Sequence, residues 1–182
     1  MIRAAVEAGA PAIQLREKGA SARAQYEAGR ALLPIVRSGG ALFFVNDRVD
    51  VALALGADGV HVGPHDVPVA AIRRATPSGF LIGASTDDGD VALHLVRDGA
   101  DYIGCGSVYP TSTKRDAGDS IGLQGLQRVV KAVPVPVVGI GGISVARSEE
   151  VATTGAAGIA VVGAVMSANN VGDAIRSLLS PW

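Results

Sequence analysis

The sequence contains one cysteine, Cys105, and three histidines among its 182 residues. One cysteine cannot form an internal disulfide, and no cysteine and histidine cluster has zinc-ligand spacing, so a disulfide framework and a structural zinc site are excluded. His61 and His65 have the spacing of a helical zinc pair, but Gly63 and Pro64 between them break a helix. We therefore expect no zinc pair there.

The chain also lacks a dominant charge and a long hydrophobic run. Sixteen Lys and Arg against seventeen Asp and Glu give a net charge of -1, which provides no electrostatic reason to expect nucleic acid or an anionic membrane as partner. No apolar run approaches the ~18 residues of a membrane span, and the first residues lack the apolar core of a secretory signal. We expect a soluble, cytoplasmic protein without a membrane partner, and the sequence leaves open whether it forms a homo-oligomer.

Short runs rich in Val, Ile and Leu alternate with segments of helical periodicity, which predicts one domain of repeated strand–helix units over residues 1–182. The predicted strands are 12–15, 41–45, 59–62, 81–84, 102–104, 135–139 and 158–162. The predicted helices are 2–8, 22–36, 48–55, 67–75, 88–97, 123–132, 145–153 and 171–179. Glycines between a helix and the next strand predict C-terminal helix caps at Gly9, Gly56, Gly99 and Gly155.

Regular alternation of apolar strands with helices indicates an α/β fold with a parallel sheet covered by helices. A doubly wound open sheet would usually place one Gly-rich turn after its first strand, whereas here polar or Gly-rich loops follow nearly every strand. A TIM-type (β/α)₈ barrel fits better, because all these loops then face one mouth. Such barrels usually need at least ~200 residues, and only seven strands are found in this sequence, so we predict a barrel that lacks the first β-strand. Its loss would expose two sheet edges, at Ile13 and Ala160.

The loops that follow the first three strands carry charged and amide side chains. Alternation along an extended chain turns Gln14, Arg16 and Lys18 to one face, although a solvated strand end is the simpler interpretation of such a run. Asn46 and Asp47 follow the second strand and open a helix, where capping is the simplest role. Asp66 is either a helix cap or a second carboxylate ligand that faces Asp47.

The later loops have the composition of anion sites. Ser85 precedes a helix and is consistent with simple capping, whereas the long loop after the fifth strand brings Thr111, Thr113 and Lys114 into a Gly-flexed segment. Hydroxyls, backbone amides and Lys are suited to phosphate. The GIGG run at 139–142 and the Val162–Gly163 pair follow the last two strands, where barrels commonly bind phosphate through backbone N–H groups.

These loops predict two anion sites. One is cationic, around Arg16, Lys18 and Lys114, and the other is neutral and built from the backbone around Gly141, Gly142 and Gly163. Asp47 and Asp66 beside a diphosphate require a metal between them. Mg²⁺ binds through one or two carboxylates together with substrate phosphates. A bound Mg²⁺ would therefore allow the aspartates and the anionic substrate to lie close together at the mouth of the barrel.

The ordered motifs of the chain resemble those of the thiamine phosphate synthase family over nearly its whole length. They are Gln14–Lys18, Asn46–Asp50, Gly59–Gly63 with Asp66, Tyr109–Lys114 and Gly139–Ile143. The resemblance implies a (β/α)₈ barrel transferase that joins hydroxymethylpyrimidine diphosphate to thiazole phosphate, with release of diphosphate. It also implies a Mg²⁺-dependent dissociative route, in which the diphosphate leaves first and the thiazole nitrogen captures a pyrimidine methylene cation.

The resemblance also implies roles for single residues. Those that would hold the diphosphate are Arg16, Lys18, Asn46, Ser85 and Lys114, and those that would ligate Mg²⁺ are Asp47 and Asp66. Gln14 and Thr111 would border the pyrimidine and the thiazole. The thiazole phosphate would bind Thr113 and the amides of Gly142, Val162 and Gly163. Pro64 and Gly163 depart from the family pattern, which often has Gln and Ser there. Both changes remove side-chain contacts, and the backbone N–H of Gly163 remains as a donor.

Three other interpretations compete with a synthase. A thiazole tautomerase is similar in fold but lacks the metal and diphosphate set and has a histidine at about the position of Ser107. A non-catalytic protein that binds thiazole phosphate is supported only by the short N-terminus. An isomerase barrel of tryptophan or histidine biosynthesis would share the last phosphate loops but would not need the run from Gln14 to Lys18.

Overall fold

The computed structural model describes residues 1–111 and 119–182. Its seven strands are β1 (Ala12–Leu15), β2 (Leu42–Asn46), β3 (Gly59–Val62), β4 (Leu81–Ser85), β5 (Tyr102–Cys105), β6 (Val137–Ile140) and β7 (Gly158–Ala160). Its helices are α1 (Ile2–Glu7), α2 (Ala22–Ser38), α3 (Val49–Leu55), α4 (Val69–Ala75), α5 (Gly89–Arg97), α6 (Gly122–Ala132), α7 (Val145–Ala152), α8 (Gly163–Met166) and α9 (Val171–Leu179).

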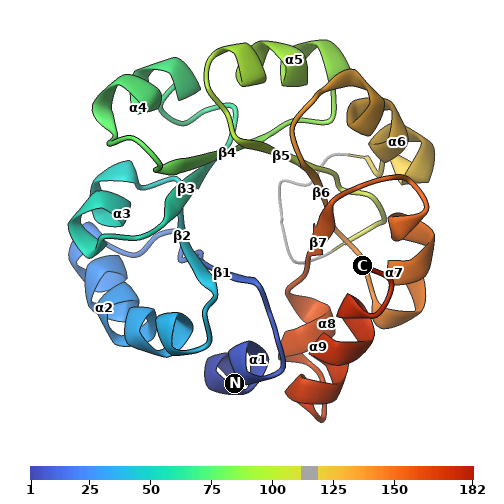
Figure 1. The fold of residues 1–182 in the computed structure, drawn as a ribbon, viewed down its shortest axis with the longest axis horizontal. Helices are drawn as coiled ribbons and strands as arrows, with labels where there is room; N and C mark the ends of the chain where they lie inside the picture. Colours follow the sequence, from blue (N-terminus) through green and yellow to red (C-terminus); the bar gives the residue numbers. More distant parts are fainter. Residues whose placement is uncertain (112–118) are drawn as a thin grey trace.

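The strands form one parallel sheet in the order β1-β2-β3-β4-β5-β6-β7, and the helices surround it (Figure 1). Each strand pairs with the next one in sequence, as when Gln14 lies opposite Phe44 and Asn46 opposite His61. This is a TIM-like α/β barrel that lacks one strand, as the sequence predicted. All strands are parallel, so their carboxyl ends share one end of the barrel.

The ring of strands is open between β1 and β7, which do not pair in the part of the chain that the structure describes. Outside this opening, α1 lies beside α9 (Figure 1). Ala5, Ala10 and Ile175 form a small buried cluster there, against which Ile13 packs. The two sheet edges expected at Ile13 and Ala160 are therefore present, and a small helical core covers the outer side near β1.

The main core lies between the sheet and the helices. Side chains alternate across a strand, and those directed at the helices, such as Phe43, Val45, Val60 and Ile82, are completely buried. Side chains on the opposite face are more exposed: Gln14 is exposed, and Asn46 and His61 are half-buried. The outer layer thus supplies most of the hydrophobic stabilisation, while the inner face carries polar groups toward the mouth.

Several element boundaries differ from the prediction for local reasons. β6 begins at Val137 and not Val135, because Pro136 has no N–H to donate to a ladder; its carbonyl accepts from the N–H of Ile103 instead. β7 ends at Ala160 and not Val162, since Val162 is the residue before α8, a short helix that the sequence analysis missed. The four predicted cap glycines all have positive φ, between 63° and 107°.

Candidate active site

Two carboxylates and two cations meet where β1, β2 and β3 end. Lys18 Nζ lies 4.0 Å from Asp47 Oδ2. Burial raises the pKa of Asp47, a contact with the Asp66 carboxylate raises it further, and the charges of Lys18 and Arg16 oppose this rise. The structure therefore brings together Arg16, Lys18, Asp47 and Asp66, four residues that come from three different loops.

Local backbone geometry holds the two carboxylates. Asp47 is the one non-glycine residue with positive φ, 62°, among the residues described, and its N–H donates to the carbonyl of His61 at 2.8 Å. Left-handed geometry in a residue other than glycine costs free energy and is concentrated at functional sites. Asp66 Oδ2 accepts from the N–H of Gly63 at 2.7 Å.

The capping interpretation of both aspartates is wrong. Arg48 precedes α3 and Pro68 precedes α4, and neither of these helices has a side-chain cap. Both carboxylates thus remain at the mouth of the barrel. Their mutual repulsion disfavours the charged form of Asp47.

These two carboxylates suit a divalent cation that takes few protein ligands. Within residues 1–111 and 119–182 no group of three or more His, Cys, Asp or Glu side chains could hold a metal. Mg²⁺ usually keeps several waters and binds through one or two carboxylates plus substrate phosphates, so it fits this pair better than a metal that needs an all-protein cage. A cation between them would also relieve the repulsion that raises the pKa of Asp47.

Ser85, at the end of β4, belongs to a hydrogen-bonded row on the inner face of the sheet. Its Oγ lies 2.8 Å from Nε2 of His61, and Nδ1 of His61 lies 2.9 Å from the hydroxyl of Tyr102. The helix cap expected in this loop is supplied by Asp88, which accepts the N–H groups of Asp90 and Val91, and not by Ser85. His61 and Tyr102 were missed from the sequence. Gly83 on the neighbouring strand β4 leaves room for the Tyr102 ring, and Gly104, two strands away on β5, leaves room for the His61 ring.

The loop after β6 is fastened to the loop after β5. Gly142 has a φ of 64°, and a Cβ there would lie 2.5 Å from the carbonyl oxygen of Pro110. Arg147 donates to the Gly142 carbonyl at 2.9 Å and lies over the Tyr109 ring at 4.4 Å, while the Tyr109 hydroxyl donates to Glu150. These contacts position the Gly142 backbone beside the loop that the sequence analysis assigned to phosphate.

The other predicted residues are placed as follows. Gln14 is an exposed residue of β1, Asn46 ends β2, and Thr111 is half-buried in the loop after β5. Val162 precedes α8 and Gly163 is its first residue, and the first N–H groups of a helix lack intrahelical acceptors. Thr113 and Lys114 lie outside the described residues.

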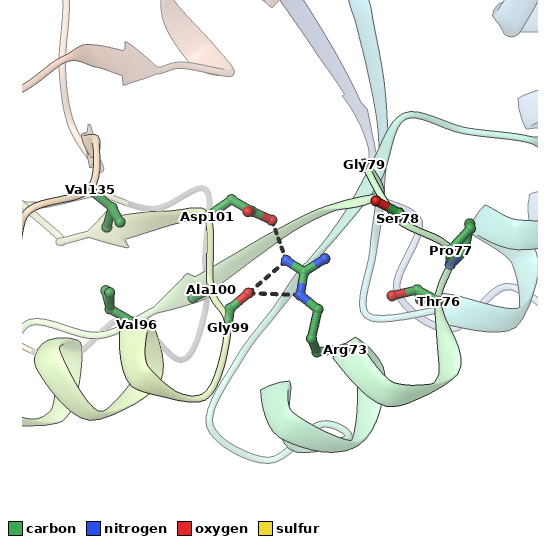
Figure 2. Close-up of a pocket in the computed structure, with 10 residues that line it drawn as sticks. All are labelled: Arg73, Thr76, Pro77, Ser78, Gly79, Val96, Gly99, Ala100, Asp101 and Val135. Carbon is green, nitrogen blue, oxygen red and sulfur yellow. Dashed lines mark hydrogen bonds and ion pairs between the residues drawn. The ribbon is translucent and has the colours of Figure 1, made fainter.

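A cavity of about 570 Å³ lies at the opposite end of the barrel (Figure 2). Its lining comes from segments that precede β4, β5 and β6, such as Pro77, Gly99 and Val135. The guanidinium of Arg73, which lines this cavity, binds Asp101 and the carbonyl of Gly99 (Figure 2). It also donates to the carbonyl of Phe80. This cation joins the loops at the amino ends of the strands, so we assign the cavity a structural role.

The fold and the polar groups at its mouth define a class, the barrel enzymes whose strand-end loops handle anionic substrates. The family model for thiamine monophosphate synthase matches residues 1–165. The chain is 50% identical over 177 residues to the thiamine-phosphate synthase of Pyrococcus furiosus, which covers 97% of this chain and 84% of that protein. It is 47% identical to the synthase of Roseiflexus castenholzii, over 98% of this chain and 78% of the relative.

A solved structure, the thiamine phosphate pyrophosphorylase from Pyrococcus furiosus, superposes with a TM-score of 0.90 at 47% identity, over 99% of this chain and 86% of that one. A 3-hexulose-6-phosphate synthase superposes with a TM-score of 0.72 at 19% identity, which is a likeness of fold alone. The chain belongs to the thiamine monophosphate synthase family. It is a transferase of thiamine biosynthesis, and no helix among the described residues is long and apolar enough to cross a membrane.

Proposed function

We propose that this enzyme joins hydroxymethylpyrimidine diphosphate to thiazole phosphate in a Mg²⁺-dependent reaction that yields thiamine phosphate and diphosphate. The observation that carries the proposal is the meeting of Lys18 and Arg16 with Asp47 and Asp66 at the ends of β1, β2 and β3. Cations alone would suit any anion, and carboxylates alone would repel one. Their combination suits a diphosphate with its divalent cation.

The diphosphate would bind to side chains at the ends of neighbouring strands, namely Arg16, Lys18, Asn46, Ser85 and Lys114. Arg16 and Lys18 contribute positive charge, and Ser85 contributes a hydroxyl. Asp47 and Asp66 would hold Mg²⁺, which when bound neutralises charge on the diphosphate oxygens. At an effective dielectric constant of about 20, one unit charge pair at 4 Å contributes up to ~4 kcal/mol, so several such groups stabilise a leaving diphosphate substantially.

The reaction would follow a dissociative route. The bond between the pyrimidine methylene carbon and the diphosphate oxygen breaks, and its electron pair leaves with the diphosphate. The aminopyrimidine delocalises the positive charge on the methylene group, and the lone pair of the thiazole nitrogen then forms the new carbon–nitrogen bond. No oxidant or reductant is needed. Gln14 and Thr111 would border the two rings and keep the reacting atoms aligned.

The thiazole phosphate would bind on the other side of the mouth, to Thr113 and to the amides of Gly142, Val162 and Gly163. The contact of Gly142 with the carbonyl of Pro110, together with the Arg147 hydrogen bond, supports this role because both fix the backbone that would donate. Gly163 offers an N–H in the first turn of α8.

A direct assay tests the proposed function. Purified protein is mixed with both substrates and Mg²⁺, and thiamine phosphate and diphosphate are quantified by chromatography. We expect both products in equal amounts and their loss with EDTA, with recovery when excess Mg²⁺ is added. Isomerisation of the thiazole alone, or binding of thiazole phosphate without turnover, would contradict the proposal.

A further inference from the structure

Three side chains on the inner face form a row that crosses β3, β4 and β5. The Tyr102 hydroxyl contacts His61 Nδ1 at 2.9 Å, and His61 Nε2 contacts Ser85 Oγ at 2.8 Å. The row begins deep on the inner face at Tyr102 and ends at Ser85, the last residue of its strand. It therefore connects the interior of the barrel to the mouth.

The sheet is shaped to hold this row. A Cβ at Gly83 would lie 2.1 Å from the Tyr102 ring, and a Cβ at Gly104 would lie 2.8 Å from the His61 ring. Phe44 meets Tyr102 edge to face, with ring centroids 5.6 Å apart. Packing thus fixes both rings, and their hydrogen bonds do not depend on mobile side chains.

The direction of the two hydrogen bonds follows from the Tyr102 hydroxyl. Burial raises the pKa of Tyr102, so its phenol keeps its proton at any physiological pH. In the part of the chain that the structure describes, the hydroxyl has one hydrogen-bond partner, His61 Nδ1. Tyr102 is half-buried, and no other acceptor for its hydrogen is found among the described residues, so Tyr102 donates to Nδ1 and His61 carries its own hydrogen on Nε2.

We propose that Tyr102 and His61 are positioning residues that set Ser85 as a hydrogen-bond donor to the diphosphate. His61 Nε2–H donates to Ser85 Oγ, and the Ser85 hydrogen then points to an acceptor in the mouth. With the other tautomer, Nε2 would accept the Ser85 hydrogen, and only oxygen lone pairs would face the anion. The inference rests on the proposed function, because it requires Ser85 to contact the diphosphate.

Binding of inorganic diphosphate in the presence of Mg²⁺, measured by calorimetry, tests this role. A hydrogen bond to a charged group is worth enough for Ser85→Ala to raise the Kd about 10-fold or more, and we expect Tyr102→Phe to raise it about 3- to 10-fold. Tyr102→Phe keeps the ring that packs on Phe44. Tyr26→Phe, which removes a hydroxyl on α2 in the outer layer, is the matched control and should leave the Kd unchanged.

The double variant separates a positioning role from general damage. If Tyr102 acts only through Ser85, then Tyr102→Phe adds less than about 2-fold in the Ser85→Ala background. A Kd for Tyr102→Phe equal to that of the unaltered protein, or fully additive effects, would overturn the inference while leaving the proposed function intact. An unchanged Kd for Ser85→Ala would remove Ser85 from the diphosphate site and overturn both. If Tyr102→Phe fails to fold, His61→Gln replaces it in the same cycle.

A spectroscopic measurement reads the tautomer without reference to activity. Nitrogen-15 NMR of protein labelled on histidine distinguishes a protonated ring nitrogen from an unprotonated one, and the signals that disappear in His61→Gln identify His61. We expect a protonated Nε2 and an unprotonated Nδ1 at pH 8, and a mixture of tautomers in Tyr102→Phe. A proton on Nδ1 of His61 in the unaltered protein would refute the arrangement.

Discussion

Lys18 Nζ lies 4.0 Å from Asp47 Oδ2, although the two residues belong to loops that follow different strands. The Lys18 side chain is 53% exposed, so this pair adds little to the free energy of unfolding. The pair instead places the Lys18 ammonium group beside Asp47, where a diphosphate and its metal would bind. We therefore expect it to influence turnover more than stability.

Lys18→Ala should lower kcat about 100-fold with a Tm close to that of the unaltered protein, because it removes a charge that would stabilise the leaving diphosphate. Steady-state kinetics with both substrates and thermal unfolding measure the two effects. Arg30→Ala is a suitable control, since the one ion-pair partner of Arg30 in the described ranges is Glu27, on the exposed face of α2. Unaltered kcat for Lys18→Ala would contradict the assignment.

Asp47→Asn should raise the Tm of the metal-free protein and abolish turnover. Burial and Asp66 raise the pKa of Asp47 above its ordinary value of 3.8, so the folded state disfavours the charged form. The folded protein then binds the proton more tightly than the unfolded chain, and stability falls as pH rises from the unfolded pKa through the folded one. The gain in Tm should be full at neutral pH and vanish below about pH 4.

Asp50→Asn is the matched control for the preceding prediction. Arg48 lowers the pKa of Asp50, so its ionised form stabilises the folded state above the unfolded pKa. The variant should leave the Tm at pH 7 unchanged or lower it slightly, whereas Asp47→Asn should raise it. The effect should be small because both side chains of the Arg48–Asp50 pair are well exposed. A lower Tm for metal-free Asp47→Asn would show that the carboxylate is not under electrostatic strain.

Gly142→Ala should raise the KM for thiazole phosphate at least about 10-fold, because the proposed hydrogen bond from the Gly142 N–H to the phosphate depends on the loop conformation. The new Cβ would meet the Pro110 carbonyl oxygen at 2.5 Å. Gly40→Ala provides the control, since Gly40 has a similar φ of 71° and nothing within 4 Å of its Cβ position. Both variants carry the cost of a left-handed alanine, about 1–2 kcal/mol. Equal kinetics in the two variants would disprove the role of the contact.

Arg73→Met should destabilise the fold by about 2–3 kcal/mol without altering KM for either substrate, since hydrogen bonds to a charged group are lost at a partly buried site. Arg73 binds Asp101 and Gly99 (Figure 2). It also donates to the carbonyl of Phe80, and these partners lie at the amino ends of β4 and β5, opposite the mouth. Urea unfolding measures the change. Arg74→Met, on the exposed side of the same helix, should cost little. A kinetic defect in Arg73→Met would mean that this cavity takes part in the reaction.

The sequence by itself determined the architecture. Periodicity placed the seven strands, because alternating apolar segments and glycine caps are local signals that each element carries within itself. It also placed the charged residues at strand ends, and parallel strands bring all such ends to one mouth. The errors at β6 and α8 also have local causes. Pro136 makes β6 begin later than predicted, and the predicted seventh strand ends early because Val162 is the residue before the short helix α8.

Only the tertiary structure decided how these residues are used. Asp47, Asp66 and Ser85 all look like helix caps in sequence, and they cap nothing in the fold, because Asp47 and Asp66 meet across two loops and Ser85 turns to His61. The row from Tyr102 to Ser85 has no local signature. Its members are 17 to 41 residues apart in the chain, and hydrogen-bond partners on neighbouring strands depend on sheet register, which is fixed by the packing of the whole barrel.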